Sequence, residues 1–141
     1  MKTSAPEQVE IRIPRSAEFV RVARMATCAL ASQLNFTYDV IKDIELAVGE
    51  ACANAVEHVY RDRPNEILIR FSVDDTQIAV EVVDRGQGFD PERAKMAKDL
   101  DTWDDPGGLG LLVMREVMDE VAIDCDEASG TCVRMVKYRP R

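Results

Sequence analysis

The spacing of apolar residues in the first part of the chain predicts a strand followed by two helices. Residues 9–13 (VEIRI) alternate apolar and polar side chains up to a proline, a pattern typical of a short β-strand that stops where no backbone donor is available. Ser16 then offers an N-cap for an amphipathic helix that extends to about Asn35. Thr37 can cap a second, longer helix, which the proline-containing stretch 61–65 ends.

The same spacing predicts which faces of these helices are buried. The inner stripe predicted for the first helix consists of Phe19, Val22, Ala23, Ala26, Ala29, Leu30 and Leu34, and that for the second of Ile41, Ile44, Val48, Ala51, Cys52, Ala55 and Val59. Arg21, Arg24 and Cys28 fall on the other side of the first helix. With Arg15, the two arginines predict a basic outer surface that we expect to dock an acidic partner.

The second half of the chain begins with a predicted hairpin and ends with a helix and two strands. The runs 66–73 and 77–83 are rich in β-branched residues and are separated only by the connection 74–76. A helix is expected after the GGLG segment through about Met118, and strands are expected near 121–125 and 131–138, with a turn at Ser129 and Gly130 between them. Leu112, Val113, Val117 and Met118 are predicted to face inward.

Between the hairpin and the GGLG segment the pattern weakens. Asp90 and Pro91 start a short charged helix that ends near Leu100, and residues 101–108 are rich in turn formers, so we expect a lid-like insertion. Helices and antiparallel-type strands alternate without a regular βαβ rhythm. The sequence therefore predicts a single α+β domain, 1–141, with helices on one face of a mixed, mostly antiparallel sheet.

Net charge, cysteine content and the absence of long apolar runs limit the classes of function and the cellular location that the sequence predicts. A formal net charge of −8 disfavours direct binding to nucleic acid or to an anionic membrane surface. The cysteines form no CxxC pair and are predicted to be small buried hydrophobes. The amino-terminal residues lack the apolar run of a signal peptide and no later stretch reaches the length of a membrane span, so a cytoplasmic location is expected.

Three polar or glycine-rich patches carry the candidate chemistry. Glu50, Asn54 and His58 recur every four residues and form one stripe on the second helix, where a carboxylate is a candidate general base and an Asn oxygen a candidate Mg²⁺ ligand. The segment 84–89 (DRGQGF) follows a strand, and its Asp can accept a hydrogen bond from an exocyclic amine. The segment 107–110 (GGLG) leads into a helix whose N-terminus suits phosphate groups.

Each patch also has a plain structural interpretation. The stripe could be a solvated helix edge, the first glycine segment a turn, and the second a connector before a helix. Neither the GxxxxGK[ST] motif nor the HRD and DFG motifs of protein kinases occur, so the P-loop and eukaryotic-type kinase classes are excluded as far as motifs can exclude them. His58 is more readily interpreted as a packed histidine than as a phosphate acceptor, because no separate acceptor helix precedes it.

Taken in order, ELAVGEACANAVEH, DRGQGFD and GGLGLLVM resemble the N, G1 and G2 boxes of the histidine-kinase-like (GHKL) ATPase superfamily. Within it, the chain is similar to the anti-sigma-factor serine kinases, especially the anti-sigma-B type, from about Val9 to Tyr138. The resemblance implies a two-layer Bergerat sandwich, ATP with Mg²⁺, and a homodimer. It also implies phosphorylation of a serine on a STAS-domain anti-anti-sigma protein and binding of an alternative sigma factor.

The resemblance assigns roles to individual residues. Glu50 matches the catalytic base, Asn54 the magnesium ligand and Asp84 the adenine-binding carboxylate. Four glycines match the nucleotide-binding loops of the family: Gly86, Gly88, Gly108 and Gly110. Thr131 matches a strand residue of the family that supports the adenine pocket. On this basis an Asp84→Asn exchange is expected to abolish nucleotide binding without unfolding the chain.

Some positions depart from the family pattern. Ala53 and Gly49 stand where many members carry Thr and Ser, and the lid lacks the Arg often found near the second glycine box. Arg93, Lys95 and Lys98 are candidates for contact with the γ-phosphate, and Trp103 for covering the nucleotide, although a solvated charged helix and simple packing explain them as well. Three alternatives stay open: a switch kinase that does not bind sigma, a nucleotide-dependent binding module, and an ATPase that drives a conformational change.

Overall fold

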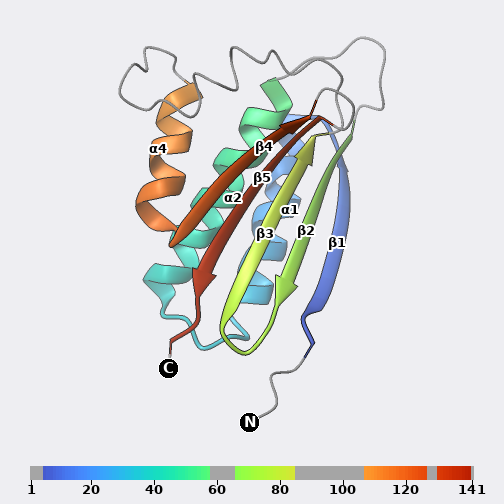
Figure 1. Cartoon of the computed structure of the whole chain (residues 1–141). Helices are drawn as coiled ribbons and strands as arrows, with labels where there is room; N and C mark the ends of the chain where they lie inside the picture. The colour runs from blue at the N-terminus through green and yellow to red at the C-terminus, as the bar shows by residue number, and fades with distance from the viewer. Residues whose placement is uncertain (1–4, 58–65, 85–106, 127–129, 141) are drawn as a thin grey trace.

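Three helices pack on one face of a five-stranded sheet in the computed structural model, which describes residues 5–57, 66–84, 107–126 and 130–140 (Figure 1). In chain order the elements are β1 (Glu7–Pro14), α1 (Ala17–Ala31), α2 (Tyr38–Glu57), β2 (Glu66–Val73), β3 (Gln77–Asp84), α4 (Gly107–Val117), β4 (Glu120–Asp126) and β5 (Gly130–Tyr138). The α+β prediction and the order of these elements are confirmed. The short charged helix predicted near 90–100 lies outside the described residues.

The strands pair in the order β1-β2-β3-β5-β4, and each of these pairings is antiparallel. The predicted hairpin joins β2 to β3 through a turn in which Asp74 Oδ1 accepts hydrogen bonds from the backbone N–H of Thr76 at 2.7 Å and of Gln77 at 3.0 Å. Because these bonds favour the charged carboxylate, the pKa of Asp74 is lowered. The turn thereby fixes the register in which Ile69 lies opposite Val82.

The core lies between α2 and the helix-facing side of the sheet. Successive strand residues point to opposite faces, so Ile67, Ile69 and Phe71 of β2 all point toward the helices. They meet the buried stripe of α2, which includes Ile44 and Val48 as predicted. In Figure 1, α2 lies between α1 and α4, and its two flanks are covered by these helices. The position of α2 therefore organises the whole helical layer.

The stripe predicted for α1 was partly wrong. The buried residues are Val20, Ala23, Thr27 and Ala31, whereas Phe19, Val22 and Ala29, which were predicted to be inside, are exposed. The physical reason is Thr27, whose hydroxyl donates a 2.8 Å hydrogen bond to the carbonyl oxygen of Ala23. A polar residue satisfied in this way can occupy the inner face, which a count of apolar residues cannot anticipate.

The inward face of α4 also differs from the prediction. Met118 is buried as predicted and Val113 and Val117 are partly buried, but Leu111 and Met114 are buried in place of Leu112, which is 43% exposed. The approach of Gly110 to α2, described below, turns this face of α4 toward the core. Position in the helix, rather than hydrophobicity, decides which leucine is buried.

We predict that Phe71→Ala lowers the free energy of unfolding by about 3–5 kcal/mol, because the side chain is fully buried and its loss leaves a cavity. Urea denaturation followed by circular dichroism measures the change. Val22→Ala, at a side chain that is 49% exposed on α1, is the matched control and should change the stability by no more than about 0.5 kcal/mol. Equal effects of the two substitutions would contradict the assignment of the core.

Candidate functional site

Several predicted site residues meet at one end of the sandwich. Figure 1 shows that β1 and β3 end there, that the C-terminal end of α2 lies beside them, and that α4 and β5 begin there. Asp84 is the last residue of β3, and Glu50 and Asn54 belong to the C-terminal half of α2. Residues that are far apart in the sequence are thus brought together by the antiparallel topology and the up-and-down course of the helices.

Asp84 lies on the helix-facing side of β3 and is almost fully buried, with 3% of the residue exposed. The side chain of Arg15, which follows β1, binds it with both terminal nitrogens. Nη1 donates to Oδ2 at 2.9 Å and Nη2 donates to Oδ1. Nη1 also donates to the carbonyl oxygen of Ala55 in the last turn of α2, at 2.6 Å. The carboxylate is therefore held in a fixed orientation.

This contact corrects the prediction that Arg15 contributes to a basic outer surface. The Arg15 residue is 8% exposed, while Arg21 and Arg24 are exposed on α1 as predicted. The physical reason is the carboxylate of Asp84, since a buried charge requires a buried counter-charge. The sequence contained a weak signal for it: an arginine between a strand that ends at Pro14 and a helix that begins at Ala17 lies at the end of the sheet.

Thr131 of β5 lies directly opposite Asp84 on the neighbouring strand β3. Its Oγ1 is buried and has no hydrogen-bond partner within the described part of the chain. Leaving a buried hydroxyl unsatisfied costs free energy, so such a group is a candidate for contact with a ligand. A fixed acceptor and a hydroxyl that can donate or accept therefore lie side by side, as recognition of the polar edge of a nucleobase requires.

Glu50 and Asn54 form a second part of the site against the beginning of α4. A Cβ atom placed on Gly110 would lie 2.8 Å from Glu50 Oε2 and 3.4 Å from Asn54 Nδ2. Only a glycine permits this approach without a shift of the neighbouring side chains. The predicted stripe on α2 and the predicted phosphate-binding segment are therefore adjacent, and Gly108 lies in the first turn of α4, where free backbone N–H groups suit phosphates.

A Mg²⁺ ion bound beside phosphates needs few ligands from the protein. It is commonly held by one or two protein oxygens, with phosphate oxygens and water completing an octahedron. Within the described ranges no group of three or more His, Cys, Asp or Glu side chains could hold a metal by itself. Asn54, half-buried next to Glu50 and the start of α4, fits a Mg²⁺ site in which the protein supplies one oxygen and phosphates and water supply the others.

Other predicted site residues cannot be placed. Gly86, Gly88, His58, Arg93, Lys95, Lys98 and Trp103 lie outside the described residues, so the roles predicted for them stay predictions. The candidate site residues that are described at this end are Arg15, directly after β1, and residues of α2, β3, α4 and β5. They form two neighbouring groups, one around Asp84 and one around Glu50.

The cysteines agree only in part with the prediction of small buried hydrophobes. Cys52 is fully buried in α2, and burial raises the pKa of its thiol to about 12. Cys28 and Cys132 are half-buried and donate to the carboxylates of Glu45, at 2.9 Å, and Glu81, at 3.6 Å. Burial and the nearby Glu81 raise the pKa of Cys132 to about 11. At neutral pH these thiols are protonated and poor metal ligands.

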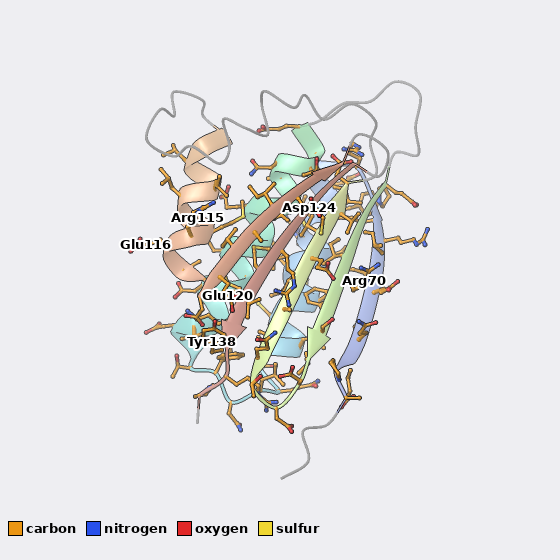
Figure 2. All side chains as sticks on the ribbon, viewed as in Figure 1. Arg70, Arg115, Glu116, Glu120, Asp124 and Tyr138 are labelled. Carbon is orange, nitrogen blue, oxygen red and sulfur yellow. The ribbon has the colours of Figure 1, made fainter. Side chains whose placement is uncertain are left out.

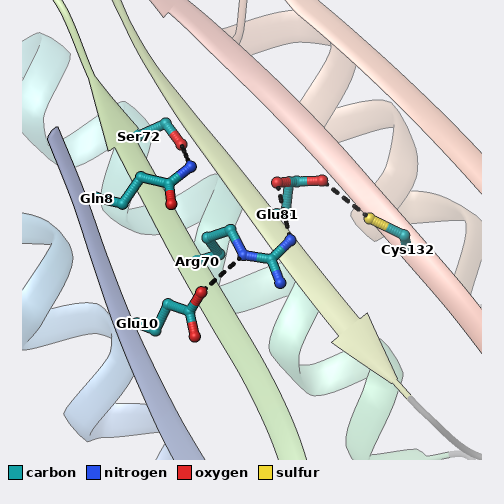
Figure 3. Close-up of polar contacts among 6 residues, drawn as sticks. All are labelled: Gln8, Glu10, Arg70, Ser72, Glu81 and Cys132. Carbon is teal, nitrogen blue, oxygen red and sulfur yellow. Dashed lines mark hydrogen bonds and ion pairs between the residues drawn. The ribbon is translucent and has the colours of Figure 1, made fainter. Parts of the chain in front are cut away.

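The face of the sheet that is turned away from the helices carries a row of alternating charges that sequence analysis did not identify. Arg70 lies between Glu10 and Glu81 and bonds both carboxylates, at 3.1 Å and 3.4 Å (Figure 3). Arg134 of β5 continues the row opposite Glu81. Figure 2 shows Arg70 on this face, remote from Arg115 and Glu116 on the outer side of α4. The row neutralises its own charges and is separate from the site around Asp84.

The chain is similar to a known family of ATPase domains and to bacterial serine-protein kinases. The family model described as "Histidine kinase-like ATPase domain" matches residues 13–137. The serine-protein kinase RsbW of Bacillus subtilis (strain 168) is 37% identical over 147 residues, which cover 98% of this chain and 89% of that protein. RsbW of Halalkalibacterium halodurans is 34% identical over 151 residues, which cover 100% of this chain and 89% of that protein.

Two solved structures share the fold. The SiaB–SiaC complex from Pseudomonas aeruginosa contains a chain that matches with a TM-score of 0.71 and 15% identity, covering 91% of this chain and 88% of that one. The RsbU and RsbW domains of Rv1364c from Mycobacterium tuberculosis match with a TM-score of 0.69 and 22% identity, covering 95% of this chain and 33% of that one. None of the helices within the described ranges combines the length and apolar character of a membrane span.

We predict that Asp84→Asn lowers the free energy of unfolding by about 3–5 kcal/mol, because it leaves the charge of Arg15 buried without its counter-charge. This revises the expectation that the exchange spares the fold. The double variant Arg15→Met/Asp84→Leu removes both charges and keeps apolar volume, so its stability should equal or exceed that of the wild type. Urea denaturation of the three proteins tests this, and a fully stable Asp84→Asn protein would contradict it.

Proposed function

We propose that this chain, which belongs to the histidine kinase-like ATPase family and is a protein serine kinase that uses ATP, phosphorylates a serine on a STAS-domain anti-anti-sigma protein. In the same proposal it also sequesters an alternative sigma factor. The observation that carries the proposal is the packing of Gly110 at the start of α4 against Glu50 and Asn54. It supports a phosphoryl-transfer centre in which a candidate base, a candidate metal ligand and a helix N-terminus adjoin.

In the proposed complex the adenine base lies at Asp84. The carboxylate accepts a hydrogen bond from the exocyclic amine, and the hydroxyl of Thr131 gains the partner that the described residues do not give it. The phosphates extend toward α4, where the backbone N–H groups of Gly108 and Gly110 donate to them. Gly86 and Gly88 are assigned to the same nucleotide loops by their sequence motif alone.

Catalysis in this proposal depends mainly on positioning. Asn54 would hold Mg²⁺ through its side-chain oxygen, and the bound ion would neutralise charge on the phosphate oxygens. Glu50 accepts the proton of the substrate serine as its oxygen attacks the γ-phosphorus, and ADP leaves. The Glu50 side chain is half-buried beside Gly110, so it can reach both solvent and the phosphate site.

The partners and the oligomeric state are proposed from the family resemblance and not from the geometry of the site. A STAS-domain substrate, a bound sigma factor, a homodimer and a cytoplasmic location follow from the family resemblance and stay predictions. The alternative function is that of a switch kinase in the same type of pathway, which phosphorylates a STAS protein but does not bind sigma. Copurification with native partners, followed by incubation with labelled ATP, separates the two: a sigma factor is retained only in the first case.

We predict that Glu50→Gln lowers the rate of phosphoryl transfer by about 10²- to 10⁴-fold while ATP binding persists, because the amide is nearly isosteric but cannot take up a proton. Single-turnover phosphorylation of the STAS protein from a preformed ATP complex isolates this step. Glu116→Gln, an equivalent change on the outer side of α4, is the control and should leave the rate unchanged (Figure 2). A folded, ATP-binding Glu50→Gln protein with a near wild-type rate would exclude the general-base role.

We also predict that Arg21→Glu slows association with the acidic partner surface, and more so at low salt, because Arg21 is exposed on α1 in a protein of net negative charge. Arg21 is preferred to Arg24, which lies 3.7 Å from Glu45 and whose reversal would also break that ion pair. Stopped-flow or surface-based kinetics at two ionic strengths measure the effect. Arg134→Glu, on the opposite layer, is the control; equal association rates for both variants would remove α1 from the docking surface.

A further inference from the structure

The proposed function leaves the buried side chain of Arg15 unexplained. Its guanidinium binds both oxygens of Asp84 and the carbonyl oxygen of Ala55, and the two charged side chains are only 3% and 4% exposed. An ion pair this deeply buried is weak evidence for a role in stability alone, since apolar residues of similar volume generally stabilise a core as well. The contact instead controls the carboxylate acceptor at the proposed base site.

We propose that Arg15 is a positioning residue for the nucleotide base, which holds the Asp84 carboxylate oriented as an acceptor and thereby sets the preference for adenine over guanine. This rests on the proposed contact between Asp84 and the adenine amine. Adenine presents a donor at its 6-position, whereas guanine presents an acceptor there. A carboxylate paired with a guanidinium presents acceptor oxygens, so it binds the first and repels the second.

Arg15 can hold this role while the base is bound. A carboxylate has about four lone-pair positions, so the arginine fork, with one bond to each oxygen, does not by itself exclude a further donor such as the base amine. The alternative is that the base displaces Arg15. This is disfavoured, because breaking a buried charge pair costs much more than one hydrogen bond from a neutral amine returns.

The third bond of Arg15 links the base site to the site of transfer. Ala55 lies next to Asn54 on α2, the helix that also carries Glu50. The 2.6 Å bond to the Ala55 carbonyl therefore fixes the guanidinium, and through it the Asp84 carboxylate, relative to the residues proposed to act on the phosphates. A lysine cannot reproduce this geometry, because an ammonium group is a point charge without a planar fork.

The test is nucleotide selectivity in the full-length chain. Isothermal titration calorimetry with ATP and with GTP, each with Mg²⁺, is carried out on Arg15→Lys and Arg15→Met. We expect ATP affinity to fall about 10-fold for Lys and up to about 100-fold for Met, and the ratio of ATP to GTP affinity to fall about 10-fold or more. A purely structural role would weaken both nucleotides equally and leave the ratio unchanged. Arg12→Lys, at an exposed ion pair with Glu66, is the matched control.

The outcomes separate this inference from the function on which it rests. Folded Arg15→Lys with wild-type ATP affinity and selectivity overturns the positioning role, and tighter ATP binding by that variant would make Arg15 a competitor of the base instead. If Arg15→Met fails to fold, Arg15→Lys still decides. The Arg15→Met/Asp84→Leu protein tests the base site itself: ATP binding at wild-type strength by that protein would overturn the adenine contact of Asp84, whatever Arg15 does.

Discussion

The packing of α2 against the antiparallel sheet is the interaction on which the other features depend. Ile44, Val48 and Ala51 fill one face of this helix with fully or almost fully buried apolar groups, and α1 and α4 then cover its two flanks. Because that face of α2 is buried in the core, side chains about a third of a helical turn away from it lie on the flank beside α4. Glu50 and Asn54 occupy this position, so the same burial that stabilises the domain also fixes the orientation of its proposed catalytic groups.

Periodicity in the sequence was sufficient to predict the helices and strands, but not to predict the buried face of every helix. The strands Glu66–Val73 and Gln77–Asp84 and the helix capped by Thr37 agree with the prediction because their apolar residues follow one period without interruption. The inner face of α1 could not be predicted, because Thr27 is buried through a local bond to the backbone. Similarly, the face of α4 depends on the contact of Gly110, which is visible only in three dimensions.

The candidate site was foreseeable as a list of residues but not as an arrangement. Glu50, Asn54, Asp84 and Thr131 were identified from spaced motifs, and the fold brings them to one end of the sandwich. The contact between Arg15 and Asp84 joins residues 69 positions apart, and no local pattern could reveal it. Its discovery changes the interpretation of both residues: the arginine is removed from the docking surface, and the carboxylate becomes part of an ion pair whose loss affects folding as well as binding.

The row of Glu10, Arg70, Glu81 and Arg134 has a consequence for the way other molecules meet this protein. Equal numbers of positive and negative groups alternate across four strands, so their fields cancel within about one Debye length. The excess negative charge of the chain must then originate elsewhere on its surface. A charged molecule that approaches this row therefore meets little net field from the row itself, and any long-range steering of such a molecule must come from other charged groups on the surface.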